Sequence, residues 1–299
     1  MSIPRIAPYA IPSQLPDNRV NWTVAPQRAA LLIHDMQEYF LDFYDRDAEP
    51  VATALRNIAA IRARCRELNI PVFYTAQPAE QADSDRGLLN DMWGPGLPAR
   101  PERHPIVASL SPAADDTVLT KWRYSAFQRS PFLNLLRQQG RDQLIICGIY
   151  AHIGCMSTAL DAFMYDIQPF FVADGLADFS ADRHAMALEY VAQRCGVTLD
   201  SQRLLGQLGQ LDQQAAPASA APSAEALRAA IAELLQQPAS DIGLDDNLLD
   251  WGLDSIRLMS LLEQWRALGA EIDFIELAQQ PTVNAWQALL ARQLDGAAA

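Results

Sequence analysis

The sequence has 299 residues, enough for about two domains of roughly 150 residues each. Half of the residues are hydrophobic, which excludes global disorder. The 23 basic and 36 acidic side chains give a net charge of −13, and this acidity argues against a nucleic-acid-binding protein, which needs a basic face.

Two further features bear on the compartment and on metal binding. No apolar run reaches the ~18 residues that a membrane span requires, and the first residues lack a basic segment followed by a long apolar one. The four cysteines lie far apart and form no C-x-x-C motif, so neither a disulfide framework nor a zinc site is expected. We therefore predict a cytoplasmic protein that uses no metal.

Residues 1–207 alternate short apolar runs with longer amphipathic stretches. The apolar runs are rich in β-branched and aromatic residues, as in strands that are buried on both faces. They cover residues 29–35, 71–77, 117–121, 143–150 and 169–174, and helical patterns lie at 51–68, 130–139, 155–166 and 182–195. This alternation predicts an α/β domain with a parallel sheet flanked by helices, whose site lies beyond the carboxyl ends of the strands.

Residues 208–223 are rich in Ala, Gln, Pro and Ser. Such a segment buries too little surface to offset its ordering entropy, so we predict a flexible linker; the alternative, a surface loop, is uncommon at this length. In residues 224–299 the apolar residues have helical spacing, as at Leu258, Leu261 and Trp265. This region is predicted to be a small four-helix bundle.

Polar or turn-forming residues follow the predicted strands. Asp35 ends the first strand, Gln77 the second and Lys121 the third, and residues 150–154 follow the fourth. Because the carboxyl ends of parallel strands meet at one rim, we expect a carboxylate, an amide and an ammonium group to converge there. Lys121 is the only lysine in the chain; a solvated surface charge is the alternative interpretation of it.

These residues resemble a known family. HDMQ (34–37), Lys121 and GIYAHIGCMSTALDAF (148–163) are similar to motifs of the isochorismatase-like cysteine hydrolase superfamily, and the resemblance spans nearly all of residues 1–207. Members of that superfamily carry an Asp–Lys–Cys triad on an α/β sheet of this kind. The resemblance also implies a non-proline cis peptide bond near Ala151–His152.

The sequence departs from the amidases of this superfamily at the nucleophile. Their nucleophile lies four residues before a T-A-x-D-A run, here residues 158–162, so its position falls on Gly154. Cys155 comes one residue late, which is ~100° around a helix, and its sulfur should point away from the site. Glycine in place of the thiol resembles the true isochorismatases and closes the covalent route, so Gly154 is assigned to the catalytic site.

The resemblance implies isochorismate as the substrate. Its enolpyruvyl ether would be cleaved to pyruvate and 2,3-dihydro-2,3-dihydroxybenzoate, without a metal. Asp35 is the candidate acid that protonates the vinyl carbon; burial would raise its pKa and Lys121 would lower it, and the sequence leaves that balance open. Lys121 and Arg86 are expected to bind the two substrate carboxylates. The residues expected to line the pocket are Gln77, Arg86, Trp93 and Tyr150.

Several of these assignments have plainer alternatives. Trp93 could be a core residue, and Arg86 could be a solvated charge. His34 and His152 are expected to be hydrogen-bonded turn residues without a chemical role. A related ether, 2-amino-2-deoxyisochorismate, is a rival substrate, although a carrier domain argues against it.

Residues 246–265 resemble the phosphopantetheine attachment region of acyl and peptidyl carrier proteins, through the G-x-D-S pattern at 252–255. Ser255 is placed at the start of an amphipathic helix, where free N–H groups and the helix dipole favour a phosphate; an ordinary N-cap serine is the alternative. The resemblance implies a covalent 4′-phosphopantetheine on Ser255. Ile256 and Met259 lie off the apolar stripe and are expected to form a docking face beside it.

The two regions together resemble the bifunctional isochorismatase and aryl carrier proteins of catecholate siderophore synthesis. The implied partners are a phosphopantetheinyl transferase, a 2,3-dihydroxybenzoate-adenylating ligase and a condensation domain of a nonribosomal peptide synthetase. The resemblance also implies self-association of the α/β domain. Two alternatives stay open: an amidase that uses Cys155, and a non-catalytic scaffold that docks the carrier.

Overall fold

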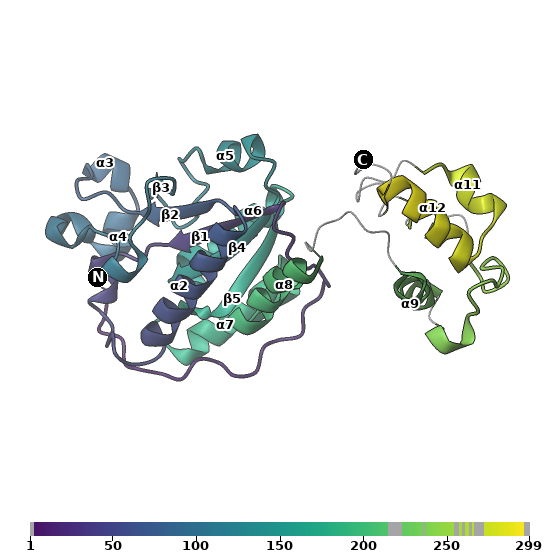
Figure 1. Cartoon of the computed structure of the whole chain (residues 1–299). Coiled ribbons are helices and arrows are strands. Elements are labelled where there is room, and N and C mark those ends of the chain that lie inside the picture. The colour runs from purple at the N-terminus through teal and green to yellow at the C-terminus, as the bar shows by residue number, and fades with distance from the viewer. Residues whose placement is uncertain are drawn as a thin grey trace. The chain divides into compact units, whose positions relative to one another are not determined.

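The chain forms two compact units, residues 1–210 and 211–299 (Figure 1). The computed structural model describes residues 3–214, 223–235, 237–253, 257–258, 261–262, 265 and 272–295. Among the helices described there, none is long and apolar enough to cross a membrane.

The first unit is built on a six-stranded, fully parallel sheet with the strand order β3-β2-β1-β4-β5-β6. Its strands are β1 (Ala29–His34), β2 (Val72–Ala76), β3 (Thr117–Thr120), β4 (Gln143–Ile149), β5 (Gln168–Ala177) and β6 (Val197–Leu199). The parallel α/β fold and all five predicted strands are confirmed. Strand β6 was not predicted, because three residues are too few to show a pattern.

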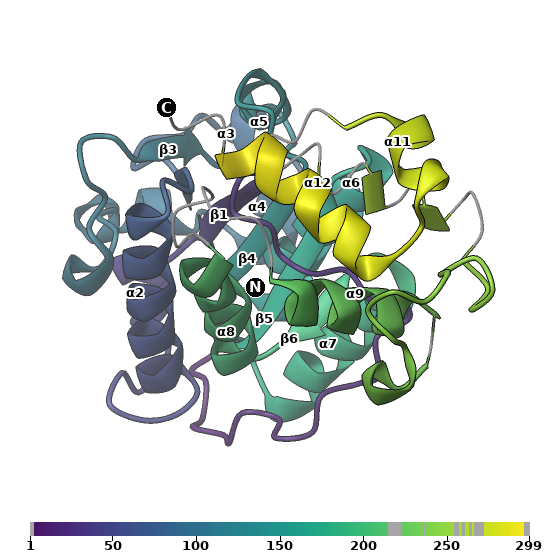
Figure 2. The ribbon, with the colours of Figure 1, turned by 45° about the vertical axis from the view of Figure 1, so that its right-hand side comes forward.

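Helices cover both faces of the sheet, because side chains along each strand point alternately to the two faces. Leu31 and Ile33 of β1 pack in one core with α2 (Val51–Glu67) and α8 (Ser201–Gln214), and Figure 2 shows both helices in front of the strands. Ala30 and Leu32 pack in the opposite core. The helices of that second face are α5 (Phe132–Gln138), α6 (Met156–Met164) and α7 (Ala181–Arg194).

A long excursion between β2 and β3 covers the carboxyl end of the sheet. It holds α3 (Asp83–Arg86), α4 (Leu89–Trp93), η1 (Leu97–Ala99), η2 (Pro101–Arg103) and η3 (Ala108–Leu110). Arg100 and Arg103 pair with Asp42, just after α1 (Glu38–Leu41), and Gln37 Nε2 donates to the carbonyl of His104 at 2.7 Å. These contacts tie the excursion to the segment that follows β1.

The turn after β4 differs from the prediction. The non-proline cis peptide bond joins Ile149 and Tyr150, not residues 151–152, so it lies where the strand ends. One turn of π-helix, η4 (Ala151–Cys155), then leads into α6.

The described part of the second unit is helical and has its own core. Its elements are α9 (Ala224–Leu235), η5 (Ala239–Asp241), α11 (Phe274–Gln279) and α12 (Val283–Asp295). Leu227, Leu258 and Trp286 are among the residues that pack together. The predicted linker begins too early, because α8 continues to Gln214 and Leu208 is buried against the sheet.

Candidate active site

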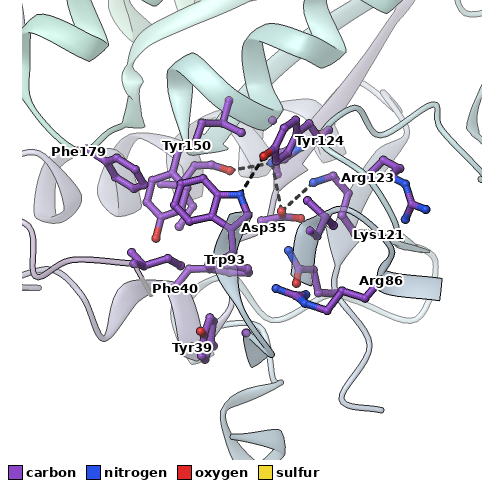
Figure 3. A pocket seen from close by; sticks show the side chains of 18 residues that line it. Asp35, Tyr39, Phe40, Arg86, Trp93, Lys121, Arg123, Tyr124, Tyr150 and Phe179 are labelled. Atoms are coloured by element: carbon purple, nitrogen blue, oxygen red, sulfur yellow. Dashed lines mark hydrogen bonds and ion pairs between the residues drawn. The ribbon is translucent and has the colours of Figure 1, made fainter. Parts of the chain in front are cut away.

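A pocket opens at the carboxyl ends of β1 to β4 (Figure 3). The structure brings all seven predicted first-unit residues to it, five of them from the carboxyl ends of strands or the turn after β4, as expected for a parallel sheet, and Arg86 and Trp93 from the excursion after β2. They are Asp35, Gln77, Arg86, Trp93, Lys121, Tyr150 and Gly154.

Asp35 directly follows β1 and is held by two neighbouring strands. Its φ is +50°, a left-handed conformation that aspartate tolerates better than most residues. Thr75 Oγ1 donates to Asp35 Oδ1 at 2.5 Å and accepts the Asp35 N–H at 3.0 Å. Lys121 Nζ lies 2.9 Å from Asp35 Oδ2, and both side chains are buried. The carboxyl group is therefore fixed in position on both oxygens.

The structure decides the balance that the sequence left open. Burial raises the pKa of Asp35, but the charge of Lys121 and the hydrogen bonds from Thr75 and Lys121 outweigh it and hold the pKa below the usual aspartate value. In the free protein Asp35 is consequently a carboxylate at neutral pH. The protonated form becomes available only if something offsets Lys121.

Arg86 is a buried cation, only 4% exposed, at the edge of the same pocket. Its Nε donates to the carbonyl of Gly94 at 2.7 Å, and Nη1 lies 3.5 Å from Gln81 Oε1. Among the described residues it pairs with no carboxylate, and burial lowers its pKa. The alternative of a solvated surface charge is wrong, and a buried guanidinium without a counterion favours an anionic ligand.

The turn at residues 94–96 determines where the Arg86 guanidinium lies. A Cβ atom at Gly96 would overlap that guanidinium. Gly96 also has a backbone φ of +62°, a conformation that residues other than glycine rarely adopt. Gly96→Ala is therefore expected to displace Arg86 and to raise the KM for a dianionic substrate by about tenfold, with a smaller change in kcat, since one charged hydrogen bond contributes roughly 1.5–3 kcal/mol. Steady-state kinetics measure both constants.

Gly206→Ala is the matched control, because a Cβ there meets nothing within 4 Å. An unchanged KM in the Gly96→Ala variant would contradict the assigned role of this turn.

Aromatic side chains form one wall of the pocket. Trp93 donates from Nε1 to the Tyr124 hydroxyl at 2.8 Å and makes an edge contact with Phe179, 6.0 Å between ring centres. Tyr150 packs against Tyr44, Phe40 and Phe179, and its buried hydroxyl has no hydrogen-bond partner in the described structure. An unpaired buried hydroxyl in a pocket is available to a ligand.

Gly154 and Cys155 take different positions relative to the pocket. Gly154 lines it, whereas Cys155 is fully buried in the core formed with α5, α6 and α7, and burial raises its pKa well above the usual thiol value. The predicted orientation of Cys155, away from the site, is confirmed. A neutral, enclosed thiol is not an activated nucleophile.

Both histidines near the site are hydrogen-bonded, but only His152 lies in a turn; His34 is the last residue of β1, so the expected turn position is wrong for it. His34 Nδ1 lies 2.7 Å from the carbonyl oxygen of Ile149. His152 contacts Asp178 twice, through its backbone N–H and through Nδ1, both at 2.6 Å. These contacts fasten the turn that carries Gly154.

Sequence reasoning missed several residues of the pocket. Tyr124 accepts a hydrogen bond from Trp93, and Arg123 adds a third cation to the lining; Thr75 holds the Asp35 carboxyl group without lining the pocket itself. Thr75 could have been found, because it lies two residues before Gln77 at the end of a strand. The remaining missed residues come from segments whose folding has no local signal: Ile3, Tyr39, Phe40 and Phe179.

The Ser255 prediction, with Ile256 and Met259, lies outside the described residues. On either side of it, Leu253 and Leu258 are buried in the helical core. No cluster of three metal-ligating side chains occurs in the part of the chain that the structure describes.

Comparisons with known proteins agree with this architecture. The Isochorismatase domain matches residues 29–203, and the Phosphopantetheine attachment site matches residues 225–290. "Enterobactin synthase component B" of Escherichia coli (strain K12) is 52% identical over 296 residues, 98% of this chain and 100% of that protein. The "Isochorismatase" of Bacillus subtilis (strain 168) is 52% identical over 303 residues, 97% and 96% of the two chains.

A solved structure shares the fold of the first unit. The cysteine hydrolase from Pseudomonas syringae pv. phaseolicola 1448A has a TM-score of 0.58 at 21% identity, over 66% of this chain and 99% of that chain. The family models and the relatives that match nearly the whole length identify the family. The chain belongs to the isochorismatase family, and its isochorismatase domain is followed by a phosphopantetheine attachment domain.

Proposed function

We propose that this protein hydrolyses isochorismate to pyruvate and 2,3-dihydro-2,3-dihydroxybenzoate, and that its second domain carries an activated 2,3-dihydroxybenzoyl group as a phosphopantetheine thioester. One observation carries the first part: a buried carboxyl group, Asp35, faces a pocket with unpaired cationic and hydroxyl groups but no side chain at position 154. Such a site can donate a proton and admit water without forming a covalent intermediate.

Asp35 acts as the acid in this reaction. Its proton forms a bond to the methylene carbon of the vinyl ether as the C=C π bond breaks, which leaves positive charge on the carbon that bears the oxygen. Water adds to that carbon and returns a proton to Asp35. The hemiketal then breaks its C–O bond to the ring; its hydroxyl proton passes to the ring oxygen, and pyruvate leaves.

Binding of the substrate favours the protonated form of Asp35. Isochorismate has two carboxylates, and Lys121, Arg86 and Arg123 are the cations of the pocket lining. A carboxylate bound to Lys121 offsets the ammonium charge that holds the pKa of Asp35 down, so binding raises that pKa. Tyr150, through its unpaired hydroxyl, Gln77 and Trp93 orient the ring and the enolpyruvyl group.

This coupling predicts two different pH profiles. The free protein must gain a proton on Asp35 before it reacts, so kcat/KM should fall about tenfold per pH unit through the neutral range, where almost all Asp35 is ionised. In the complex the pKa of Asp35 is higher, so kcat should stay level to a higher pH. A kcat/KM that is flat from about pH 6 to pH 8 would contradict this assignment of the acid. His34 does not interfere, because burial and the charge of Lys121 lower its pKa to about 4.

The carrier role rests on the second domain. A phosphopantetheine arm on Ser255 would supply the thiol that holds an aryl group as a thioester. The partners proposed for it are a phosphopantetheinyl transferase, a 2,3-dihydroxybenzoate-adenylating ligase and a condensation domain. The match of residues 225–290 to the Phosphopantetheine attachment site and the full-length similarity to an enterobactin synthase component support this role.

Release of pyruvate from isochorismate by the purified full chain tests the hydrolase directly. Lactate dehydrogenase and NADH report the pyruvate, and absence of turnover would favour the scaffold alternative. Cys155→Ala distinguishes the amidase alternative: we expect little loss of pyruvate release, because Cys155 does not line the pocket. Loss of turnover in that variant, with its fold intact, would contradict the proposed mechanism.

A further inference from the structure

His34 fills the space beside Gly154 where other residues would have a side chain. A Cβ atom built on Gly154 would overlap His34 Cε1, and it would lie 2.8 Å from His34 Nε2 and 3.0 Å from the carbonyl oxygen of Tyr124. The two contacts with the His34 ring are shorter than real Cβ atoms make, and the contact with the Tyr124 carbonyl is unusually tight. No side chain fits at position 154 while the imidazole stays where it is.

The imidazole of His34 is held in place from several sides. The residue is fully buried, and its backbone is paired with Gly148 of β4, so the strand cannot retreat. Nδ1 lies 2.7 Å from the carbonyl oxygen of Ile149, which fixes the orientation of the ring. Unlike the end of an arginine or lysine, this ring has no flexible chain that could move it aside.

The ring is also electrically neutral. Burial lowers the pKa of His34 to about 4, helped by the charge of Lys121, so at neutral pH the ring carries one N–H. The shorter contact places that proton on Nδ1, facing Ile149. His34 therefore occupies volume beside Asp35, at 3.7 Å from Nδ1 to Oδ2, without adding a charge to the site.

We propose that His34 is a specificity-determining residue, because its ring takes the volume that a nucleophilic side chain at position 154 would need and so reserves the site for attack by water. This inference rests on the proposed function and deepens it. Two substitutions, one at position 34 and one at 154, would be required to place a thiol in the pocket beside Asp35 and Lys121; one substitution would not be enough.

Thiol labelling tests this without any turnover of isochorismate. The four natural cysteines are buried and burial raises the pKa of each thiol, so iodoacetamide should label the folded wild-type protein very slowly. In the reaction a thiolate forms an S–C bond and iodide leaves. We expect the double variant His34→Ala/Gly154→Cys to be labelled at residue 154 about tenfold faster or more than Gly154→Cys alone. Peptide mass spectrometry locates the label.

Two controls accompany the labelling. His34→Ala alone measures any exposure of natural cysteines, and Gly206→Cys in α8 provides an open position, because a Cβ there meets no atom within 4 Å. Equal labelling of Gly154→Cys with and without His34→Ala would overturn the proposal. So would a folded double variant that remains unlabelled at residue 154.

Gly154→Ala keeps the proposal testable if the double variant does not fold. A single methyl group should lower Tm and reduce pyruvate release more than tenfold, and adding His34→Ala should restore part of the lost Tm. A Gly154→Ala protein with the wild-type Tm would show that position 154 has room and would overturn the proposal. If wild-type protein released no pyruvate, the proposed function would fail, whereas the labelling and Tm results would still decide the role of His34.

Discussion

Asp35→Asn is expected to lower kcat for pyruvate release by roughly 10²–10⁴-fold, the range that a general acid contributes. Asparagine keeps the size and shape of the side chain and can still contact Thr75 and Lys121, but its amide has no proton acidic enough to transfer to carbon. The loss should fall on kcat. The measurement is the lactate dehydrogenase assay at saturating isochorismate.

Substrate binding should not weaken in the same variant. In the wild-type protein Asp35 pairs with Lys121 at 2.9 Å, so a substrate carboxylate must compete for that ammonium. Asparagine removes the competing charge, and KM should stay level or fall. A loss of kcat without a rise in KM separates removal of the acid from general damage to the site.

Stability must be measured in the same variant. Leaving one partner of a buried ion pair without the other typically costs about 3–5 kcal/mol, so Asp35→Asn should lower Tm through the unpaired Lys121. Asp161→Asn is the matched control: its carboxylate accepts from Gln128 Nε2 at 2.9 Å outside the pocket, and its pyruvate release should be unchanged. A folded Asp35→Asn protein with wild-type kcat would remove Asp35 from the chemistry.

The site could be predicted from the sequence where it depends on topology. Asp35, Gln77 and Lys121 directly follow three strands that were evident as apolar runs, and a parallel sheet brings such positions together whatever the loops do. Gly154 was found by counting back from residues 158–162. These positions follow from spacing along the chain, which a sequence contains.

The features of the site that could not be predicted from the sequence depend on the folding of irregular segments. Tyr124 and Phe179 reach the pocket from loops after β3 and β5, and neither loop has a periodic pattern. The burial of Arg86 depends on how residues 94–96 wrap its guanidinium. The ionisation of Asp35 depends on distances of a few ångströms to Lys121 and Thr75, which only the folded structure sets.

The domain boundary shows how composition can mislead. Residues 208–214 were assigned to a linker because the surrounding segment is rich in Gln and Ala, yet they continue α8. Alanine and glutamine are good helix formers, and Leu204 and Leu208 attach this helix to the sheet. The low hydrophobicity of residues 208–214 suggested that they bury too little surface to be ordered. One apolar stripe along a helix is nevertheless enough to pack that helix against a sheet.

Ser255→Ala is expected to abolish loading of the second domain and to leave the first reaction untouched. The arm is joined through the serine oxygen, and alanine has no atom that could form the phosphodiester bond, so the effect should be complete. Incubation with coenzyme A and a phosphopantetheinyl transferase should add one arm per wild-type chain and none per Ser255→Ala chain. Intact-protein mass spectrometry measures this.

The same samples separate the two activities of the chain. Ser255→Ala should release pyruvate at the wild-type rate, because every described residue that lines the pocket belongs to the first unit. Ser240→Ala is the matched control in the second unit: its exposed hydroxyl donates to Asp241 at 2.9 Å, and loading should be normal. An arm on the Ser255→Ala protein would move the attachment to another residue. Slower pyruvate release from that protein would mean that the carrier domain takes part in the hydrolysis, which nothing in the chemistry of Asp35 requires.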